Sequence, residues 1–330
     1  MRTRMSAHVR HVLLGTAAFT LVAGAAMAAP STSPWNSPRN GPPAKATSQA
    51  TTKATAKAAS SVENWAGSSS SLYTIQPRGG ASAASGRSDP AAGDGKALEL
   101  TIPQRAGATP DHAAEVESRK TYLYGSFSSR VRTADCSKQP RTGAVNGIFT
   151  YANDGRDHNG DGIADNAELD VEILCARPWE VNLSVWTDYE ERDDGTAPQK
   201  RVSRIVDLRT GRIVSTCYFT SFDGDCVAVS AAENQPASVP ASPGFDSVGA
   251  YHDYRIDWSA DRVVFSASVN GADRVLWDYR GPSRRIPHRA ASYLVNLWHT
   301  ADWTPEGLNA TAAPTAPLTL RVDSSTVTRA

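Results

Sequence analysis

Glu168-Leu169-Asp170-Val171-Glu172-Ile173 alternates acidic and apolar residues without a break, and a period of two predicts a β-strand. Alternate side chains of a strand lie on the same face of a sheet, so the three carboxylates would line one surface while the apolar side chains enter a core. The plainer interpretation is a strand whose polar face is merely solvated. Neighbouring carboxylates repel one another, however, and at neutral pH we expect them to hold at least one more proton than isolated carboxyls would.

A shared proton indicates a chemistry. Glycoside hydrolysis with retention requires one carboxylate that attacks the sugar and one protonated carboxyl that releases the leaving group. Glu168, Asp170 and Glu172 are therefore the candidate catalytic residues. The Cα atoms of the outer two would lie about 13 Å apart on an extended strand, whereas retaining enzymes hold their carboxyls about 5 to 5.5 Å apart. We therefore expect the strand to bend and the two long side chains to lean together.

Strand-like segments continue on both sides of the acidic strand. Alternating or β-branched runs, separated by Gly, Pro, Asp and Asn, occur at 97–102, 181–186, 201–208 and 318–327, and no segment has a convincing helical period. Asn270-Gly271 predicts a two-residue hairpin turn, because both residues accept positive φ. Many short strands with regular turns predict an all-β fold of two packed sheets, a sandwich or jelly roll.

Further motifs accompany the acidic strand. They are Tyr122-Leu123-Tyr124-Gly125-Ser126-Phe127-Ser128-Ser129-Arg130-Val131-Arg132, Gly143-Ala144-Val145-Asn146-Gly147-Ile148-Phe149-Thr150-Tyr151, a pair of strands over 251–265, and Asn296-Leu297-Trp298. In this order they resemble the lichenase and laminarinase type of retaining glycoside hydrolases, family sixteen, and the resemblance runs from about Trp65 to the end of the chain. It implies a concanavalin A-like β-sandwich jelly roll of two antiparallel sheets.

The resemblance also implies roles for the carboxylates. It makes Glu168 the nucleophile, Glu172 the general acid/base, and Asp170 the residue that holds the nucleophile and tunes the acid. The E-x-D-x-E spacing is the compact form, which in the family includes lichenases and xyloglucan transglycosylases, whereas laminarinases and agarases have an additional residue and a bulged strand. Several departures from the family pattern leave the substrate less defined than the chemistry. They lie at Ser126, Ser128, Ala167, Ile173 and Cys175.

Residues that contact the sugar follow from the same resemblance. Flat aromatic rings match the apolar faces of pyranose units, and the family places Asn296 and Trp298 near the cleaved bond and an arginine, here Arg130, toward the cleft. Each side chain has a plainer role open to it: a core position for a ring, to which we assign Trp258, or a surface ion pair for the arginine. The predicted substrate-binding residues are Arg130, Tyr151, Trp186, Asn296, Trp298 and Trp303.

A possible metal loop precedes the acidic strand. Residues 157–165 have oxygen ligands at positions one, three, five and nine and glycine at position six, as in a calcium loop, and Glu168 would be position twelve. A bidentate calcium ligand could not also be a free nucleophile, and no helices flank the loop. We therefore expect a shorter loop that leaves Glu168 free and binds a structural calcium ion, with a solvated turn as the alternative; the chemistry itself requires no cofactor. The predicted ligands are Asp157, Asn159, Asp161 and Asp165.

The N-terminus predicts export. Arg2, Arg4 and Arg10 precede an apolar run over 12–26 and a small-residue cleavage site at 26–28, which is typical of a signal peptide, here 1–28. The run is too short and too rich in Ala and Gly for a convincing membrane span. Residues 29–60 have almost no large apolar side chain, which predicts a disordered leader. One catalytic β-sandwich domain would then occupy 61–330 of a secreted, extracellular protein.

Four cysteines follow the leader, and an even number in an exported chain predicts two disulfides. An Asp-Gly turn lies between Cys217 and Cys226, so we pair these two and leave Cys136 with Cys175, although three connectivities are open. Neither spacing resembles a C-x-x-C pair of zinc ligands.

Charge narrows the class of partner. The 34 basic residues balance 34 acidic ones, so the chain has no electrostatic footprint for nucleic acid and a neutral polymer suits it better. We expect a secreted retaining endo-β-glucanase that hydrolyses β-1,3-1,4 or β-1,3 glucan through a glycosyl-enzyme intermediate, as a monomer without a membrane partner. Two alternatives stay open: a transglycosylase with the same residues, and a lectin-like protein that binds carbohydrate without catalysis and would not need the three carboxylates.

Overall fold

The computed structural model describes residues 59–108, 112–221, 224–301 and 310–330. The predicted signal peptide, nearly all of the predicted leader and Trp303 lie outside these ranges. The named elements within them are β-strands and a 3₁₀ helix of 3 residues, η2 (Ser283–Arg285). No helix in these ranges is long and apolar enough to cross a membrane.

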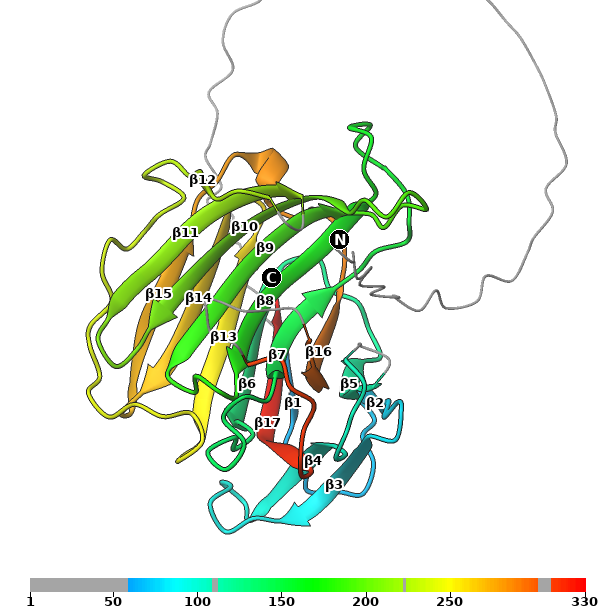
Figure 1. The fold of residues 1–330 in the computed structure, drawn as a ribbon, viewed down its shortest axis with the longest axis vertical. Helices are drawn as coiled ribbons and strands as arrows, with labels where there is room; N and C mark the ends of the chain where they lie inside the picture. Colours follow the sequence, from blue (N-terminus) through cyan, green and yellow to red (C-terminus); the bar gives the residue numbers. More distant parts are fainter. Residues whose placement is uncertain (1–58, 109–111, 222–223, 302–309) are drawn as a thin grey trace, which may run out of the picture. The chain divides into compact units, whose positions relative to one another are not determined.

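Two sheets form the described part of the chain (Figure 1). The first, sheet A, is 8-stranded in these residues and follows the order β15-β14-β13-β6-β17-β4-β3, with β1 paired to β17. The strand bounds are Ala272–Tyr279 for β15, Arg262–Val269 for β14, His252–Ser259 for β13, Gly125–Arg132 for β6, Leu318–Arg329 for β17, Lys96–Ile102 for β4, Ser82–Ser88 for β3 and Ser60–Glu63 for β1.

Sheet B is 9-stranded in the described residues and has the order β12-β11-β10-β9-β8-β7-β16-β5-β2. The strand bounds are Val227–Ala228 for β12, Arg212–Ser221 for β11, Pro198–Asp207 for β10, Glu180–Tyr189 for β9, Asp165–Leu174 for β8, Ala144–Tyr151 for β7, Ser292–His299 for β16, Ala114–Ser118 for β5 and Tyr73–Ile75 for β2. Every pairing between these named strands is antiparallel.

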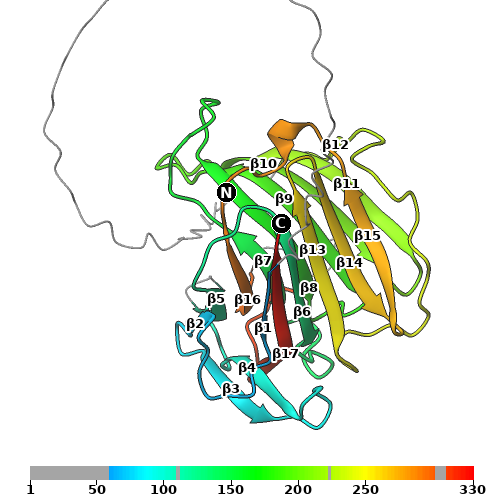
Figure 2. The same ribbon diagram turned by 180° about the vertical axis from the view of Figure 1, so that it is seen from behind.

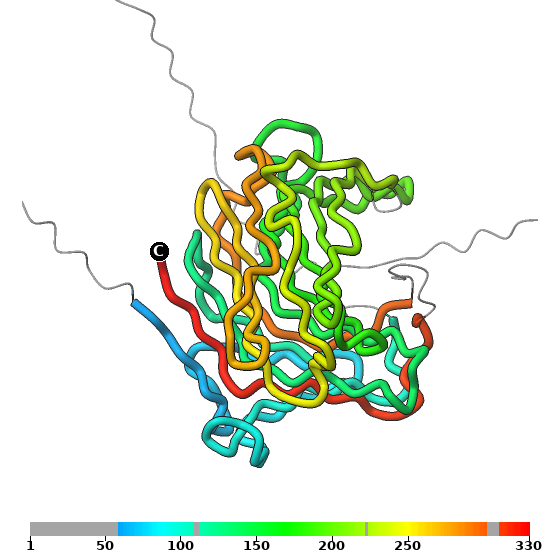
Figure 3. The backbone as a smooth tube through the Cα atoms, turned by 90° about the vertical axis from the view of Figure 1, so that its left-hand side faces the viewer, coloured from blue at the N-terminus to red at the C-terminus, as the bar shows by residue number. Residues whose placement is uncertain are grey.

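The two sheets lie in separate layers. Strands β8 to β11 run side by side in front of β13 to β15 in Figure 1, and the order is reversed from behind in Figure 2. Figure 3 shows the same separation from the side, with the yellow-to-orange strands β13 to β15 apart from the yellow-green strands β10 and β11. The predicted all-β sandwich of two antiparallel sheets is confirmed, and the predicted strands at 97–102, 181–186, 201–208 and 318–327 are β4, β9, β10 and β17.

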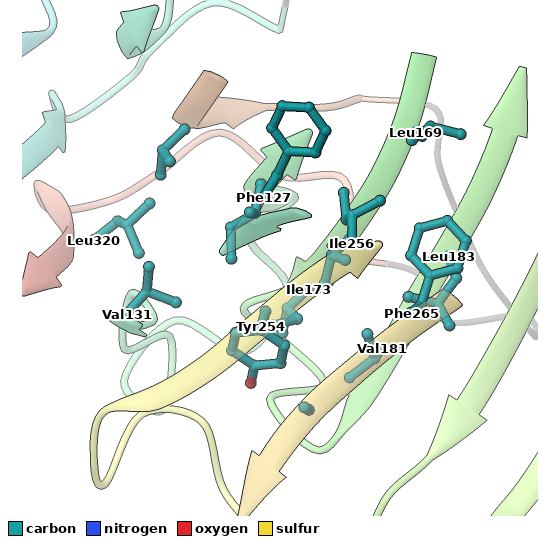
Figure 4. Packing of buried hydrophobic residues seen from close by; sticks show 14 of the residues in the cluster. Phe127, Val131, Leu169, Ile173, Val181, Leu183, Tyr254, Ile256, Phe265 and Leu320 are labelled. Atoms are coloured by element: carbon teal, nitrogen blue, oxygen red, sulfur yellow. The ribbon is translucent and has the colours of Figure 1, made fainter. Parts of the chain in front are cut away.

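The apolar half of the acidic strand enters the core between the layers. Leu169, Val171 and Ile173 are at most 1% exposed, and Figure 4 shows Leu169 and Ile173 in one cluster with Phe127 and Ile256 of sheet A. Each fully buried side chain of this size contributes about 1.5–3 kcal/mol. A register slip of one residue would place the carboxylates in this core instead, so packing fixes which face of sheet B they occupy.

The predicted covalent and turn features are present. Cys136 is bonded to Cys175, directly after β8, and Cys217 of β11 is bonded to Cys226, directly before β12. Asn270 and Gly271 join β14 to β15 with φ of 54° and 76°, so both residues of the hairpin turn have the positive φ that Asn-Gly predicts. Trp258 is 3% exposed and belongs to the core, as expected.

Candidate active site

Strand β8 presents the three carboxylates on the side of sheet B that points away from the core, which we call the carboxylate face. Its pairing with β7 and β9 is continuous from Leu169 to Glu172, and its register shift against β9 lies before Glu168. The segment from Glu168 to Glu172 is therefore a regular strand. No bulge lies between the two glutamates, so a bulge does not supply the bend that the sequence predicted. Any approach of their carboxyls depends on strand twist and on the reach of the side chains.

Each carboxyl has a different environment. Asp170 is 3% exposed and accepts a hydrogen bond of 2.7 Å from the indole Nε1 of Trp186. Glu168 is half-buried and accepts a hydrogen bond of 2.7 Å from Nδ2 of Asn166 at its Oε2 atom. Glu172 is also half-buried. Of the two outer carboxyls, Glu168 thus has an amide donor that stabilises its ionised form.

Burial holds protons on this group near neutral pH. Removal from water raises the pKa of Glu168 to about 7, although hydrogen bonds from Asn166 and Asp170 oppose the rise. Burial and the charge of Glu168 raise the pKa of Glu172 to about 8. The pKa of Asp170 also lies well above its usual value, because it is buried between two other carboxylates. Hydrogen bonds thus oppose the rise in pKa at Glu168, whereas at Glu172 the charge of Glu168 adds to the effect of burial.

A cation that the sequence interpretation did not single out faces this group. Arg201 of β10 lies with its guanidinium carbon 4.5 Å from the ring centroid of Trp186, and its charge opposes the rise in pKa that burial causes at all three carboxyls. The signal available in the sequence is weak: Arg201 alternates with Val202 in a strand, which predicts an outward position and nothing about a partner.

A second set of groups lies on the other side of Glu172. Gly147 of β7 is the Cα partner of both Glu172 and Asn296. A Cβ atom at Gly147 would lie 2.5 Å from Oδ1 of Asn296, so the glycine makes room for this amide. Nδ2 of Asn296 donates a 3.2 Å hydrogen bond to Glu115, which is buried and paired with Arg78. The predicted residue Asn296 is therefore brought to the carboxylates, whereas Glu115 and Gly147 were not predicted.

Asn182 of β9 lies opposite Glu172 on its other flank. The amide oxygens of Asn182 and Asn296 are buried and have no hydrogen-bond partner within the described part of the chain. Both oxygens belong to residues on the same face of sheet B as Glu172, and each can accept a hydrogen bond from a protonated carboxyl that reaches it.

The predicted aromatic residues have different surroundings. Tyr151 of β7 lies close enough to Glu168 for the carboxylate charge, together with burial, to raise its pKa. Trp186 uses its indole N–H on Asp170 and has one ring face against Arg201, so it is placed to hold Asp170. Tyr189, which was not predicted, packs edge-on against Trp186 at 5.9 Å. Trp298 is half-buried on β16, two residues from Asn296.

The prediction that Arg130 faces the cleft is wrong. Arg130 belongs to β6 of sheet A, on the far side of the core from the carboxylates. Its neighbours Ser129 and Val131 are buried, so Arg130 points away from the core, where it pairs with Asp253 at 2.9 Å and with Asp323 at 3.0 Å. The plainer role, a surface ion pair of small energetic value, is the one that it has.

The predicted metal loop is held by protein groups. The Asp157 carboxylate accepts hydrogen bonds from the backbone N–H groups of Gly160, Asp161 and Gly162. Lys200 pairs with Asp161 and lies 3.8 Å from Asp188. No three His, Cys, Asp or Glu side chains of the described ranges gather in a way that could hold a metal ion. Calcium binding stays a prediction, and it would require Asp161 to exchange the Lys200 ammonium for the ion.

This chain is similar to solved structures but matches no known family by sequence. No protein-family model matches the sequence, and no curated protein sequence does. The β-glucanase of Bacillus licheniformis has 17% identity and a TM-score of 0.48 over 82% of this chain and 98% of that one. A glycoside hydrolase family 16 endo-glucanase from Bacteroides ovatus has 13% identity and a TM-score of 0.47 over 81% and 98%.

A Crh5 transglycosylase is also similar, with 17% identity and a TM-score of 0.48 over 83% of this chain and 86% of that one. One of these similar structures is thus a family 16 enzyme, and family sixteen is also the family that the sequence motifs resemble. Likeness at this level does not transfer an activity, so the function has to rest on the residues of the carboxylate face.

Replacing Glu172 with Gln should change the pH dependence of stability. The folded protein binds more protons at Glu172 than the unfolded chain does between about pH 4.5 and pH 8, so this carboxyl lowers stability as pH rises through that window. We expect Glu172→Gln to have a melting temperature close to that of the native protein at pH 5 and a higher one at pH 8. The gain should be on the order of 1–2 kcal/mol, because three coupled carboxyls share the protons.

Asp193→Asn, a change of the same kind at an exposed position, is the control, and its effect at each pH is subtracted from that of Glu172→Gln. If the difference in melting temperature between Glu172→Gln and the native protein is the same at pH 5 and pH 8, Glu172 is ionised at both pH values.

Proposed function

We propose that this chain is a retaining glycosidase of the family-sixteen type, with Glu168, Asp170 and Glu172 as its catalytic residues. The observation that carries the proposal is the difference between the two outer carboxyls on one regular strand: Glu168 has an amide donor, whereas Glu172 shares its face of the sheet with the free amide oxygens of Asn182 and Asn296. One is suited to attack as a carboxylate and the other to donate a proton.

The first step forms a glycosyl-enzyme. Glu172 gives its proton to the glycosidic oxygen, the bond from that oxygen to the anomeric carbon breaks, and a carboxylate oxygen of Glu168 bonds to the anomeric carbon. The fragment on the reducing side leaves as an alcohol. Asp170 hydrogen-bonds Glu168 and is itself held by Trp186, so it orients the nucleophile before the attack.

The second step returns the enzyme to its starting state. Glu172, now ionised, takes a proton from a water molecule whose oxygen attacks the anomeric carbon, and the bond to Glu168 breaks. The product keeps the configuration of the substrate because two inversions have occurred. A sugar hydroxyl in place of water would give transglycosylation with the same residues.

The substrate that we propose is a β-1,3-1,4 or β-1,3 glucan, attacked within the chain by a secreted enzyme. Tyr151, Trp186 and Trp298 provide apolar surface on or beside the carboxylate face for pyranose rings. Two disulfides are consistent with an oxidising compartment outside the cell. A protein that only bound carbohydrate would gain nothing from three repelling, desolvated carboxyls, and for this reason the lectin alternative is disfavoured.

A panel of lichenan, laminarin, xyloglucan and agarose tests the activity. We expect the mature protein to release reducing ends from lichenan or laminarin and to lower the viscosity of the solution early, because an endo-acting enzyme cuts within chains. Glu168→Gln should retain the fold and lose this activity by at least roughly a thousandfold. If no polysaccharide loses chain length, the hydrolase proposal fails; transfer to a labelled oligosaccharide acceptor without net hydrolysis would identify the transglycosylase.

Azide separates the roles of the two glutamates. With an aryl β-glycoside, whose leaving group needs little protonation, Glu172→Ala should still form the glycosyl-enzyme, and azide should then give a β-azide product. Glu168→Ala lacks the nucleophile, so azide should attack from the opposite face and give the α-azide. Nuclear magnetic resonance spectra of the products distinguish the two anomers, and exchanged outcomes would mean that nucleophile and acid are assigned the wrong way round.

Calcium binding to the loop at 157–165 has its own test. If the ion binds the folded protein, the melting temperature should be higher in calcium than in chelator by mass action, and Asp161→Ala should remove that difference. Asp194→Ala, a change of an exposed aspartate outside the loop, should keep it. Equal melting of the native protein in calcium and in chelator would reject the site.

A further inference from the structure

One row of side chains crosses four strands of sheet B at the level of Glu168. Glu168 of β8 pairs with Trp186 of β9, Trp186 pairs with Arg201 of β10, and Arg201 pairs with Phe219 of β11. Residues directly opposite one another on neighbouring strands point to the same face. The row therefore runs along the carboxylate face, outward from the carboxyl to which we assign the nucleophilic role.

Two aromatic rings hold the Arg201 guanidinium. Its central carbon lies 4.5 Å from the ring centroid of Trp186 and 4.7 Å from that of Phe219. The Nε atom is buried and has no hydrogen-bond partner among the residues that the structure describes. Arginine stacks on rings in this way because its charge is delocalised over a plane and is weakly hydrated. The contact leaves the edge of the guanidinium as its hydrogen-bonding surface.

The same stack orients Trp186. The indole ring can donate from Nε1 to Asp170, at 2.7 Å, only in one orientation, and Arg201 covers a face of the ring in that orientation. Tyr189 supports the indole from a second direction with an edge-on contact at 5.9 Å. A change at Arg201 therefore reaches Asp170 through Trp186.

The charged side chains next to the row contact partners outside it. Lys200, the residue before Arg201, is directed to Asp161 and Asp188. On β11, Tyr218 lies under Arg285, which pairs with Glu233. The groups whose charges act on the carboxyls, or respond to them, are Glu168, Asp170, Glu172, Tyr151, Tyr189 and Arg201. Among these described groups, Arg201 is the one that carries a positive charge.

We propose that Arg201 is a positioning residue of the active site: fixed between Trp186 and Phe219, it keeps the indole on Asp170 and supplies the positive charge that sets how many protons the three carboxyls share. This inference rests on the proposed function for its kinetic consequence, although the sharing of protons is a property of the folded protein whether or not it hydrolyses a glycan. Loss of the charge would favour one more bound proton, and a protonated Glu168 cannot attack.

Arg201→Met tests the inference, because methionine can lie between the two rings without a charge. Opposite charges lower a carboxyl pKa by about 1–3 units at close range, so both limbs of the pH profile of kcat/KM should move to higher pH by about one unit. On the acidic limb this corresponds to roughly a tenfold loss, which should be recovered at higher pH. Arg201→Lys, which keeps the charge without the planar stack, should restore the position of the profile but leave kcat below the native value.

Lys200→Met is the matched control, since it removes a positive charge from the adjacent residue of the same strand. Its pH profile should coincide with that of the native protein. A profile that stays in place in Arg201→Met, or that moves equally in Lys200→Met, would overturn the inference. A lower activity at every pH, without movement of the limbs, would show a structural role only.

Titration of the side-chain carboxyl carbons by nuclear magnetic resonance tests the effect of the Arg201 charge on the carboxyls without a substrate. In Arg201→Met the resonances of Glu168 and Glu172 should titrate at higher pH than in the native protein and in Lys200→Met. Unchanged titration would refute the role of Arg201 even if the protein is a glycosidase. Shifted titration in a protein that cleaves no glycan would leave the role of the charge intact and reject the proposed function.

Discussion

The packing of Leu169, Val171 and Ile173 between the sheets is the constraint on which the site depends. Because these side chains are fully buried, the alternate residues of β8 have no choice of face, and three carboxyls are held in a row. Their mutual repulsion and loss of water oppose folding, while the core contacts on the other side of the same strand favour it. The strand thus couples the hydrophobic stability of the sandwich to a strained electrostatic arrangement on its surface.

The groups around the carboxyls relieve that strain unequally. An amide donor stabilises the ionised form of Glu168, an indole donor reaches Asp170, and amide oxygens without partners flank Glu172. Identical chemical groups two residues apart therefore acquire different proton affinities from their neighbours on β7, β9 and β16. Such separation of carboxyl properties by environment is how one strand can supply both a base and an acid.

Local features of the sequence were sufficient for much of this structure. The period of two predicted the faces of β8, Asn270-Gly271 predicted the hairpin turn between β14 and β15, and the Asp-Gly sequence between Cys217 and Cys226 predicted a disulfide, since each depends on residues close together in the chain. Arg130 was misplaced because strand periodicity gives a face and does not say which sheet a strand joins. Arg201 was missed for a related reason: its partners come from β9 and β11, and only the register between strands brings them together.

Gly147 shows how the site limits its own scaffold. Glycine is a poor strand residue because it loses more backbone freedom on folding than alanine does. In the middle of a strand it lowers stability by about 0.5–1 kcal/mol relative to alanine. Strand β7 nevertheless has it in its interior, where any larger residue would meet the Asn296 amide. The space that a Cβ atom would take is occupied by the amide of a residue from the next strand, directly across from Glu172. A side chain that is missing from β7 is thus what lets Asn296 reach over the strand toward the acid.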